Sequence, residues 1–193
     1  SNSKIIMQFY STNNKDYKVS FREATMKGLA SDEGLYMPEY LPDLRNYIDG
    51  IETLSFQDLS YIIANSFMND DLSKSDIEDV VSNAIKFSAP LIKLEENQFI
   101  LELFHGPTLA FKDFGACFMA KTINKFVQNN DRELNILVAT SGDTGSAVAN
   151  GFYDIEGINV IILYPSKKIS HIQEKQIATF DKNIYTLEVE GTF

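Results

Sequence analysis

The sequence predicts an α/β protein built on a parallel sheet with covering helices and preceded by a helical N-terminal segment. Strand-like and helix-like runs alternate from residue 134 to residue 191, which is typical of parallel strands joined by helices. The runs ILVA (136–139) and VIIL (160–163) are continuously apolar, as expected of parallel strands covered on both faces. We expect two parts: a helical and turn-rich segment, residues 1–90, and an α/β portion, residues 91–193.

The N-terminal segment is predicted to contain short helices separated by turns. Ser20 and Glu23 have the spacing of a capping box at a helix start, and Gly28 is a suitable helix stop. Two further helices are predicted from apolar residues that recur with a helical period. The expected apolar face of the first is Phe56, Leu59, Ile63 and Phe67, and that of the second is Ile77, Val80, Val81, Ala84 and Ile85.

The α/β portion begins with a strand at 98–104 and a helix at 111–128 that is apolar on several sides and is therefore expected to be buried. The later elements alternate in type, with strands at 134–140, 159–165 and 183–191 and helices at 144–153 and 170–180. Ser170 and Gln173 form a capping box at the start of the last helix. The sequence closes on a strand and a turn with no covering helix, so we expect this chain to be the front part of a longer one.

The charge of the chain argues against some classes of partner, and its cysteine content indicates the redox state of its compartment. Seventeen Lys and Arg against 27 Asp and Glu give a net charge of −10, which argues against nucleic acid and anionic membranes as partners. A single cysteine, Cys117, excludes an internal disulfide and suggests a reducing compartment. No apolar run approaches the roughly 18–20 residues that span a bilayer, and no secretory signal pattern is present. We therefore expect a reducing compartment such as the cytoplasm, and the charge leaves open a local basic site for an anionic small molecule.

Two other classes of site find no support in the pattern of residues. His105 and His171 have no cysteine or carboxylate cluster at ligand spacing, so we expect no metal. A hydrolase of the Ser-His-Asp type lacks the G-x-S-x-G turn that would present its nucleophile. His105 is expected to be a hydrogen-bonded structural residue, His171 to be exposed, and Cys117 to belong to the core.

The stretch ATSGDTGSA (139–147) is a tight turn between a buried strand and a helix, at the edge of a parallel sheet where ligands usually bind. Gly142 and Gly145 would let the backbone approach a ligand. The side chains of Ser141, Asp143 and Thr144 and the free N–H groups of the helix start would supply hydrogen bonds for an anion. The alternative is an ordinary helix cap without a ligand.

Lys112 lies between Phe111 and Phe114, where a strand-like run gives way to a helix. The positive end of the helix dipole repels a cation there, and apolar neighbours disfavour the charged form. Both effects favour the neutral amine that a nucleophile requires. A solvated lysine at a helix start is the alternative.

Three stretches, taken together, resemble one enzyme family. ELFHGPTLAFKDFGA (102–116) resembles the lysine attachment segment of fold-type II pyridoxal-phosphate enzymes, with matches at Glu102 and along 108–116. Together with ATSGDTGSAV (139–148), it is similar to the threonine synthase family, in the branch with a long N-terminal segment. The resemblance continues through VSFREATMKGLASDEGLYMPE (19–39), FSAPL (87–91), VIILYPSKKIS (160–170) and QEKQ (173–176), and so covers nearly the whole chain in order.

The resemblance implies a role for each of these motifs. Lys112 would bind pyridoxal 5′-phosphate covalently and would then move protons as the catalytic acid and base. The loop containing Ser141, Gly142, Asp143, Thr144 and Gly145 would face the cofactor and hold the substrate carboxylate. The implied reaction converts O-phospho-L-homoserine and water to L-threonine and phosphate.

A basic turn, SKKIS (166–170), is a further candidate for binding an anion. Lys167, Lys168 and Ser170 follow a strand end and precede a helix, which suits the phosphate of the substrate. A solvated turn in which Ser170 only caps the helix is the alternative.

Two other functions stay open at the level of sequence. The chain could belong to another fold-type II enzyme, such as a serine/threonine dehydratase, or could be a non-catalytic anion-binding α/β module. In the resembling family, the glycine loop for the cofactor phosphate and the partner of the pyridine nitrogen come from sequence beyond residue 193. We therefore expect these 193 residues alone to bind the cofactor weakly and to have little activity, which a visible absorption band on adding pyridoxal phosphate would test.

Overall fold

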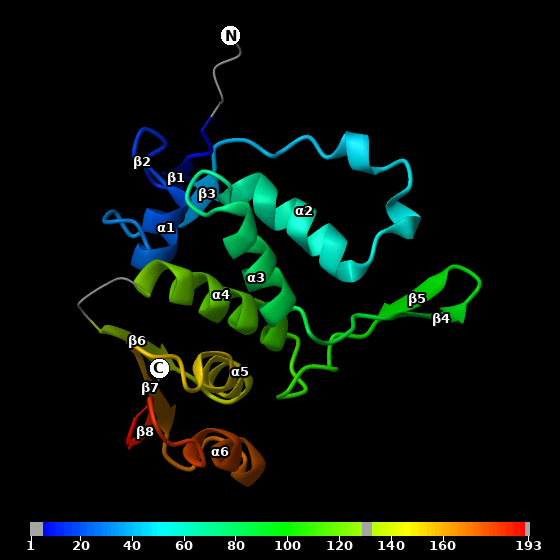
Figure 1. Ribbon diagram of the computed structural model, residues 1–193. Coiled ribbons are helices and arrows are strands. Elements are labelled where there is room, and N and C mark those ends of the chain that lie inside the picture. Colours follow the sequence, from blue (N-terminus) through cyan, green and yellow to red (C-terminus); the bar gives the residue numbers. More distant parts are fainter. Residues whose placement is uncertain (1–5, 129–132, 192–193) are drawn as a thin grey trace. The chain divides into compact units, whose positions relative to one another are not determined.

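A computed structural model of the protein describes residues 6–128 and 133–191. The chain forms two compact units, Ser1–Ser82 and Asn83–Phe193 (Figure 1). The division predicted at residue 90 falls a short distance inside the second unit. Within the described part of the chain, no helix has the length and apolar character needed to cross a bilayer.

The first unit contains a small antiparallel sheet that the sequence did not predict. Its strands are β1 (Phe9–Ser11), β2 (Lys18–Val19) and β3 (Tyr36–Pro38), in the order β2-β1-β3. Strands of two or three residues are too short to show an alternating pattern, so this region was interpreted as turns. The 3-10 helices η1 (Arg45–Tyr47) and η2 (Ile51–Thr53) follow.

Helix α1 (Phe21–Lys27) begins and ends where the sequence predicts. The Oγ atom of Ser20 accepts a hydrogen bond from the Glu23 N–H at 3.1 Å, and Gly28 ends the helix with φ +71°. The carboxylate of Glu23 instead forms an ion pair with Lys27 at 2.6 Å. The predicted capping box is therefore a single cap.

The two longer helices of the N-terminal region differ in how well their buried faces were predicted. In α3 (Lys74–Ala84) and the residue after it, all five predicted positions are buried, which confirms that face. In α2 (Phe56–Met68), the side chains of Phe56 and Ile63 are 44% and 49% exposed, whereas Ala64 and Met68 are buried. The predicted α2 face is thus only partly confirmed, since Leu59 and Phe67 are half-buried and Phe67 packs against a buried cluster. Apolar residues occupy more than one side of this helix, so periodicity alone does not select the buried side.

The second unit is built on the predicted parallel sheet. Its strands β6 (Leu134–Ala139), β7 (Ile158–Pro165) and β8 (Ile184–Val189) lie in the order β6-β7-β8, and both pairs are parallel. Helices α4 (Lys112–Val127), α5 (Asp143–Phe152) and α6 (His171–Ala178) alternate with these strands. Figure 1 shows α5 and α6 on the same side of the sheet, where α5 packs on β7 and α6 on β8. The predicted α/β class is confirmed.

The two faces of this sheet differ in their exposure. Val160, Ile162 and Ile184 point toward the helices and are at most 5% exposed. The alternate residues include Leu137 and Leu187, whose side chains are 69% and 52% exposed. Among the described residues, helices thus cover only one face, and the expected cover on both faces is not found.

The predicted strand at 98–104 belongs to a separate hairpin. Strands β4 (Leu91–Glu95) and β5 (Gln98–Leu101) pair antiparallel with each other and lie outside the parallel sheet. The connection between them is only two residues long, and such a short loop allows antiparallel pairing but no parallel crossover.

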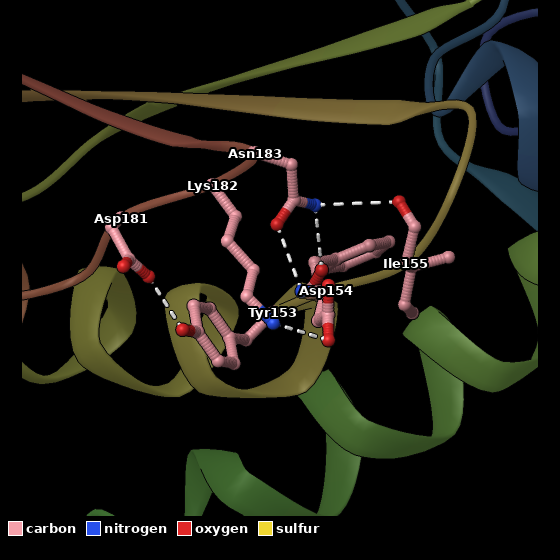
Figure 2. Close-up of polar contacts among 7 residues, drawn as sticks. Tyr153, Asp154, Ile155, Asp181, Lys182 and Asn183 are labelled. Atoms are coloured by element: carbon pink, nitrogen blue, oxygen red, sulfur yellow. Dashed lines mark hydrogen bonds and ion pairs between the residues drawn. The ribbon is translucent and has the colours of Figure 1, made fainter.

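A polar network joins the loop after α5 to the turn before β8 (Figure 2). The Nδ2 group of Asn183 donates to the carbonyl oxygens of Phe152 at 2.9 Å and Ile158 at 2.8 Å, and its Oδ1 atom accepts from the Asp154 N–H at 2.8 Å. An ion pair between Lys182 and Asp154, at 2.5 Å, lies beside it. One half-buried amide thus satisfies backbone groups at the end of the sheet opposite the loop after β6.

Replacing Asn183 with leucine removes these hydrogen bonds while keeping a side chain of similar size. We expect the free energy of unfolding to fall by about 2–3 kcal/mol, because backbone groups lose their partners. Urea unfolding measures this loss. The matched control is Lys182→Met, which removes the exposed ion pair with Asp154 and a cation–π contact with Tyr153 but no hydrogen bond to the backbone. It should shift the midpoint much less; equal effects of the two variants would contradict the role of Asn183.

Candidate functional site

A cavity of about 320 Å³ opens at the carboxyl end of β6. Three segments of the second unit form its wall, namely the start of α4, the β6–α5 loop and the first turn of α6. The lining residues are Lys112, Ala139, Thr140, Ser141, Gly142, Asp143, Thr144 and Gln173. The structure therefore brings together the two motifs that the sequence singled out, although they are far apart along the chain.

The hydroxyl of Thr140 holds the β6–α5 loop in shape. Its Oγ1 atom accepts hydrogen bonds from the N–H groups of Gly142 at 3.0 Å and Gly145 at 3.1 Å, and donates to the Gly142 carbonyl at 3.2 Å. Thr140 itself is only 4% exposed. Sequence reasoning missed this residue, because a threonine before a helix looks like any other cap.

The two glycines of the loop lie against other side chains of the protein. Gly142 has φ +156°, and a Cβ atom there would collide with the carboxamide of Gln173. A Cβ atom at Gly145 would meet the side chains of Thr140 and Ile162. Gly142 still lines the cavity, whereas Gly145 is buried outside its wall.

Lys112 is the first residue of α4 and is half-buried. Its Nζ atom lies 4.7 Å from the centre of the Phe111 ring, and the face of an aromatic ring attracts a cation. The ring of Phe114 packs instead against Phe87, with centroids 4.6 Å apart. The contacts of the two phenylalanines therefore do not support the expectation that they disfavour the charged form of Lys112.

A buried carboxylate fixes the turn that leads into Lys112. Asp113 is fully buried, and it accepts hydrogen bonds from the Thr108 N–H at 2.8 Å and the Thr108 hydroxyl at 2.6 Å. Gly106 passes so close to this carboxylate that a Cβ atom would collide with it. The path of residues 106–112 is thus set by Asp113, whose role the sequence did not reveal.

Gln173 connects α6 to the loop. Its Oε1 atom accepts from the N–H and hydroxyl of Ser170 at 3.3 and 3.1 Å, while the Ser170 hydroxyl accepts from the Gln173 N–H. The predicted capping box is therefore confirmed. The Nε2 group of the same amide donates to Asp143 Oδ1 at 3.1 Å, a contact that sequence reasoning missed.

The basic turn does not take part in the cavity wall. Lys167 is exposed and has φ +58°, and Lys168 donates to the carbonyl oxygen of Gly191 at 3.1 Å. Neither lysine lines the cavity, and Ser170 only caps α6.

The two histidines and the cysteine do not line the cavity. His105 hydrogen-bonds Glu102 at 2.7 Å, and His171 is exposed. Burial and, next, the negative charge of Asp113 raise the pKa of Cys117, so this half-buried thiol stays protonated near neutral pH. Across residues 6–128 and 133–191, no cluster of three or more His, Cys, Asp or Glu could hold a metal ion.

Comparison with known proteins points to one family for both halves of the chain. Residues 8–85 match the family model described as threonine synthase N terminus. Threonine synthases from Haemophilus influenzae and Escherichia coli are 44% and 42% identical to the chain over 97% of its length. The chain spans 43% and 44% of the length of these two relatives.

Solved structures agree with the sequence comparison. The crystal structure of threonine synthase from E. coli matches with a TM-score of 0.86 at 41% identity, over 96% of this chain and 43% of that one. The structure of pyridoxal-phosphate-bound threonine synthase from Brucella melitensis matches with a TM-score of 0.88 at 31% identity, over 96% of this chain and 41% of that one. Both matches span nearly all of this chain.

Thr140→Val tests whether the buried hydroxyl shapes the loop. Valine keeps the volume of threonine but leaves the Gly142 N–H without its partner, so we expect a loss of about 1–3 kcal/mol in the free energy of unfolding. Denaturant unfolding gives this value, and amide hydrogen exchange at Gly142 should accelerate. Thr144→Val is the matched control, because the Thr144 side chain is exposed; equal losses in the two variants would sink the assignment.

Proposed function

We infer from its similarity to the N-terminal part of threonine synthases that the chain belongs to this family and contributes to a threonine synthase. The proposed reaction converts O-phospho-L-homoserine and water to L-threonine and phosphate, with pyridoxal phosphate as cofactor. The observation that carries the proposal is that Lys112 and residues 141–144 line one cavity. The proposal includes a cytoplasmic location, which the single cysteine supports because it indicates a reducing compartment.

The residues around the cavity fit pyridoxal phosphate. The cavity offers one primary amine, that of Lys112, and hydroxyl groups from Ser141 and Thr144. A relative of similar fold, the B. melitensis enzyme, is a pyridoxal-phosphate-bound threonine synthase. When bound, this cofactor withdraws electrons from the substrate carbon that loses its proton.

Lys112 is proposed to attach the cofactor and then to carry protons. Its ε-amine sits on a flexible chain at the mouth of the cavity, so one base can reach neighbouring carbon atoms in turn. Attachment and proton transfer both need the neutral amine, whereas the nearby Phe111 ring favours the cation.

The β6–α5 loop is proposed to bind the carboxylate of the substrate. The N-terminus of α5 carries a partial positive charge, and the hydroxyls of Ser141 and Thr144 can donate hydrogen bonds to an anion. Asp143 carries a negative charge and suits donor groups of the ligand instead. Lys167, Lys168 and Ser170 are left out of the proposal because none of them lines the cavity.

Two other functions compete with this one. A serine/threonine dehydratase would use the same amine but would release ammonia from serine or threonine, with no phosphate. A non-catalytic anion-binding module would need the loop but not the lysine. Phosphate release from O-phospho-L-homoserine by the full-length protein supports the threonine synthase and excludes both alternatives.

The Lys112→Ala variant of the full-length enzyme tests the central assignment. We expect phosphate release to fall by at least about 10³-fold, because both the attachment point and the proton carrier are lost. The absorption of covalently attached cofactor should disappear as well. Lys121→Ala, further along the same helix, is the matched control and should retain both signals; a Lys112→Ala enzyme with the wild-type rate would refute the proposal.

A further inference from the structure

We propose that Gln173 is a positioning residue that holds the carboxylate of Asp143 in the wall of the cavity. The inference rests on the proposed function of that cavity and extends it to a residue on α6. Gln173 acts through Asp143, and is not itself assigned a catalytic role.

The oxygen and the nitrogen of the Gln173 side-chain amide form hydrogen bonds with different parts of the second unit. Its oxygen accepts from the N–H and hydroxyl of Ser170, which ties the side chain to the start of α6. Its nitrogen donates to Asp143 Oδ1 at 3.1 Å, thirty positions earlier in the sequence. A side chain bound at one end and donating at the other has little freedom to change rotamer, so it can fix its neighbour's orientation.

The loop is shaped to receive this amide. Gly142 lies directly before Asp143, and the space where its Cβ would lie is filled by the carboxamide of Gln173. A capping box alone needs only the contact with Ser170 and makes no demand on a distant loop. The close approach to Gly142 and the bond to Asp143 are therefore features that helix capping does not explain.

Asp143 needs such support because of where it lies. It is exposed, at the first position of α5, and it lines the cavity beside Ser141 and Thr144. An exposed aspartate without a fixed partner samples several rotamers, and a misplacement of about 1 Å in a site can cost about 10²-fold in rate. The hydrogen bond from Gln173 selects one orientation of the carboxylate.

Gln173→Glu in the full-length enzyme separates positioning from capping. Glutamate at this place still forms the capping box with Ser170, so the unfolding midpoint should stay close to that of the wild type. It replaces the donor by a second negative charge facing Asp143, so kcat/KM for O-phospho-L-homoserine should fall by about 10²-fold. Hydrogen–deuterium exchange of the amides of residues 141–146 should accelerate. Gln176→Glu, on the same helix, is the matched control and should change neither measurement.

A second substitution tests the contact itself. In the double variant Asp143→Asn with Gln173→Glu, the donor and acceptor are exchanged, and the asparagine amide can donate to the glutamate. We expect amide exchange in residues 141–146 to return toward the wild-type rate, even if activity stays low because Asp143 is lost. Wild-type loop exchange and rate in Gln173→Glu, or no recovery in the double variant, would overturn the proposal. Failure of the wild-type enzyme to release phosphate would instead refute the proposed function, since the exchange measurement does not depend on turnover.

Discussion

Parallel pairing of β6 with β7 is the constraint that places the cavity. The two strands pair in register from Leu134 with Ile158 to Ala139 with Leu163, and the Thr140 N–H extends the ladder to the Leu163 carbonyl at 3.0 Å. Because both strands run in the same direction, the chain leaves them at one edge of the sheet. The loop that leads to α5 and the segment that leads to α6 therefore meet there, although thirty residues separate Asp143 from Gln173.

Buried polar groups then turn that edge into a defined wall. Thr140 closes the loop with its hydroxyl, and Asp113 fixes the turn before Lys112 with its carboxylate. Burying such groups costs free energy unless each has partners, and here the backbone N–H groups of Gly142, Gly145 and Thr108 provide them. Both side chains lose their hydration on burial and hold the adjacent backbone in one conformation. The rigidity of the site therefore comes from groups in the protein interior.

The sequence predicted the features that depend on local pattern. The parallel strands, the helices between them, the buried face of α3 and the cap at Ser170 follow from apolar periodicity and capping rules, which act within a few residues. The sequence does not predict strands β1 to β3, because strands of two or three residues are too short to show an alternating apolar pattern. The roles of Thr140 and Asp113 and the outer contact of Gln173 were missed because a side chain's partner depends on folding. The apolar residues next to Lys112 in the sequence predict that its amine is desolvated. In the structure, the ring of Phe111 lies within cation–π distance of that amine.

Gly142 shows that a protein side chain can pack against a glycine in such a loop. A glycine after a strand is usually taken as room for a ligand to approach the backbone. Here a protein side chain, the carboxamide of Gln173, fills that room. Gly142 nevertheless lines the cavity together with the side chains of Ser141, Asp143 and Thr144. It follows that the shape of this loop depends on a residue of α6 as well as on the loop's own sequence.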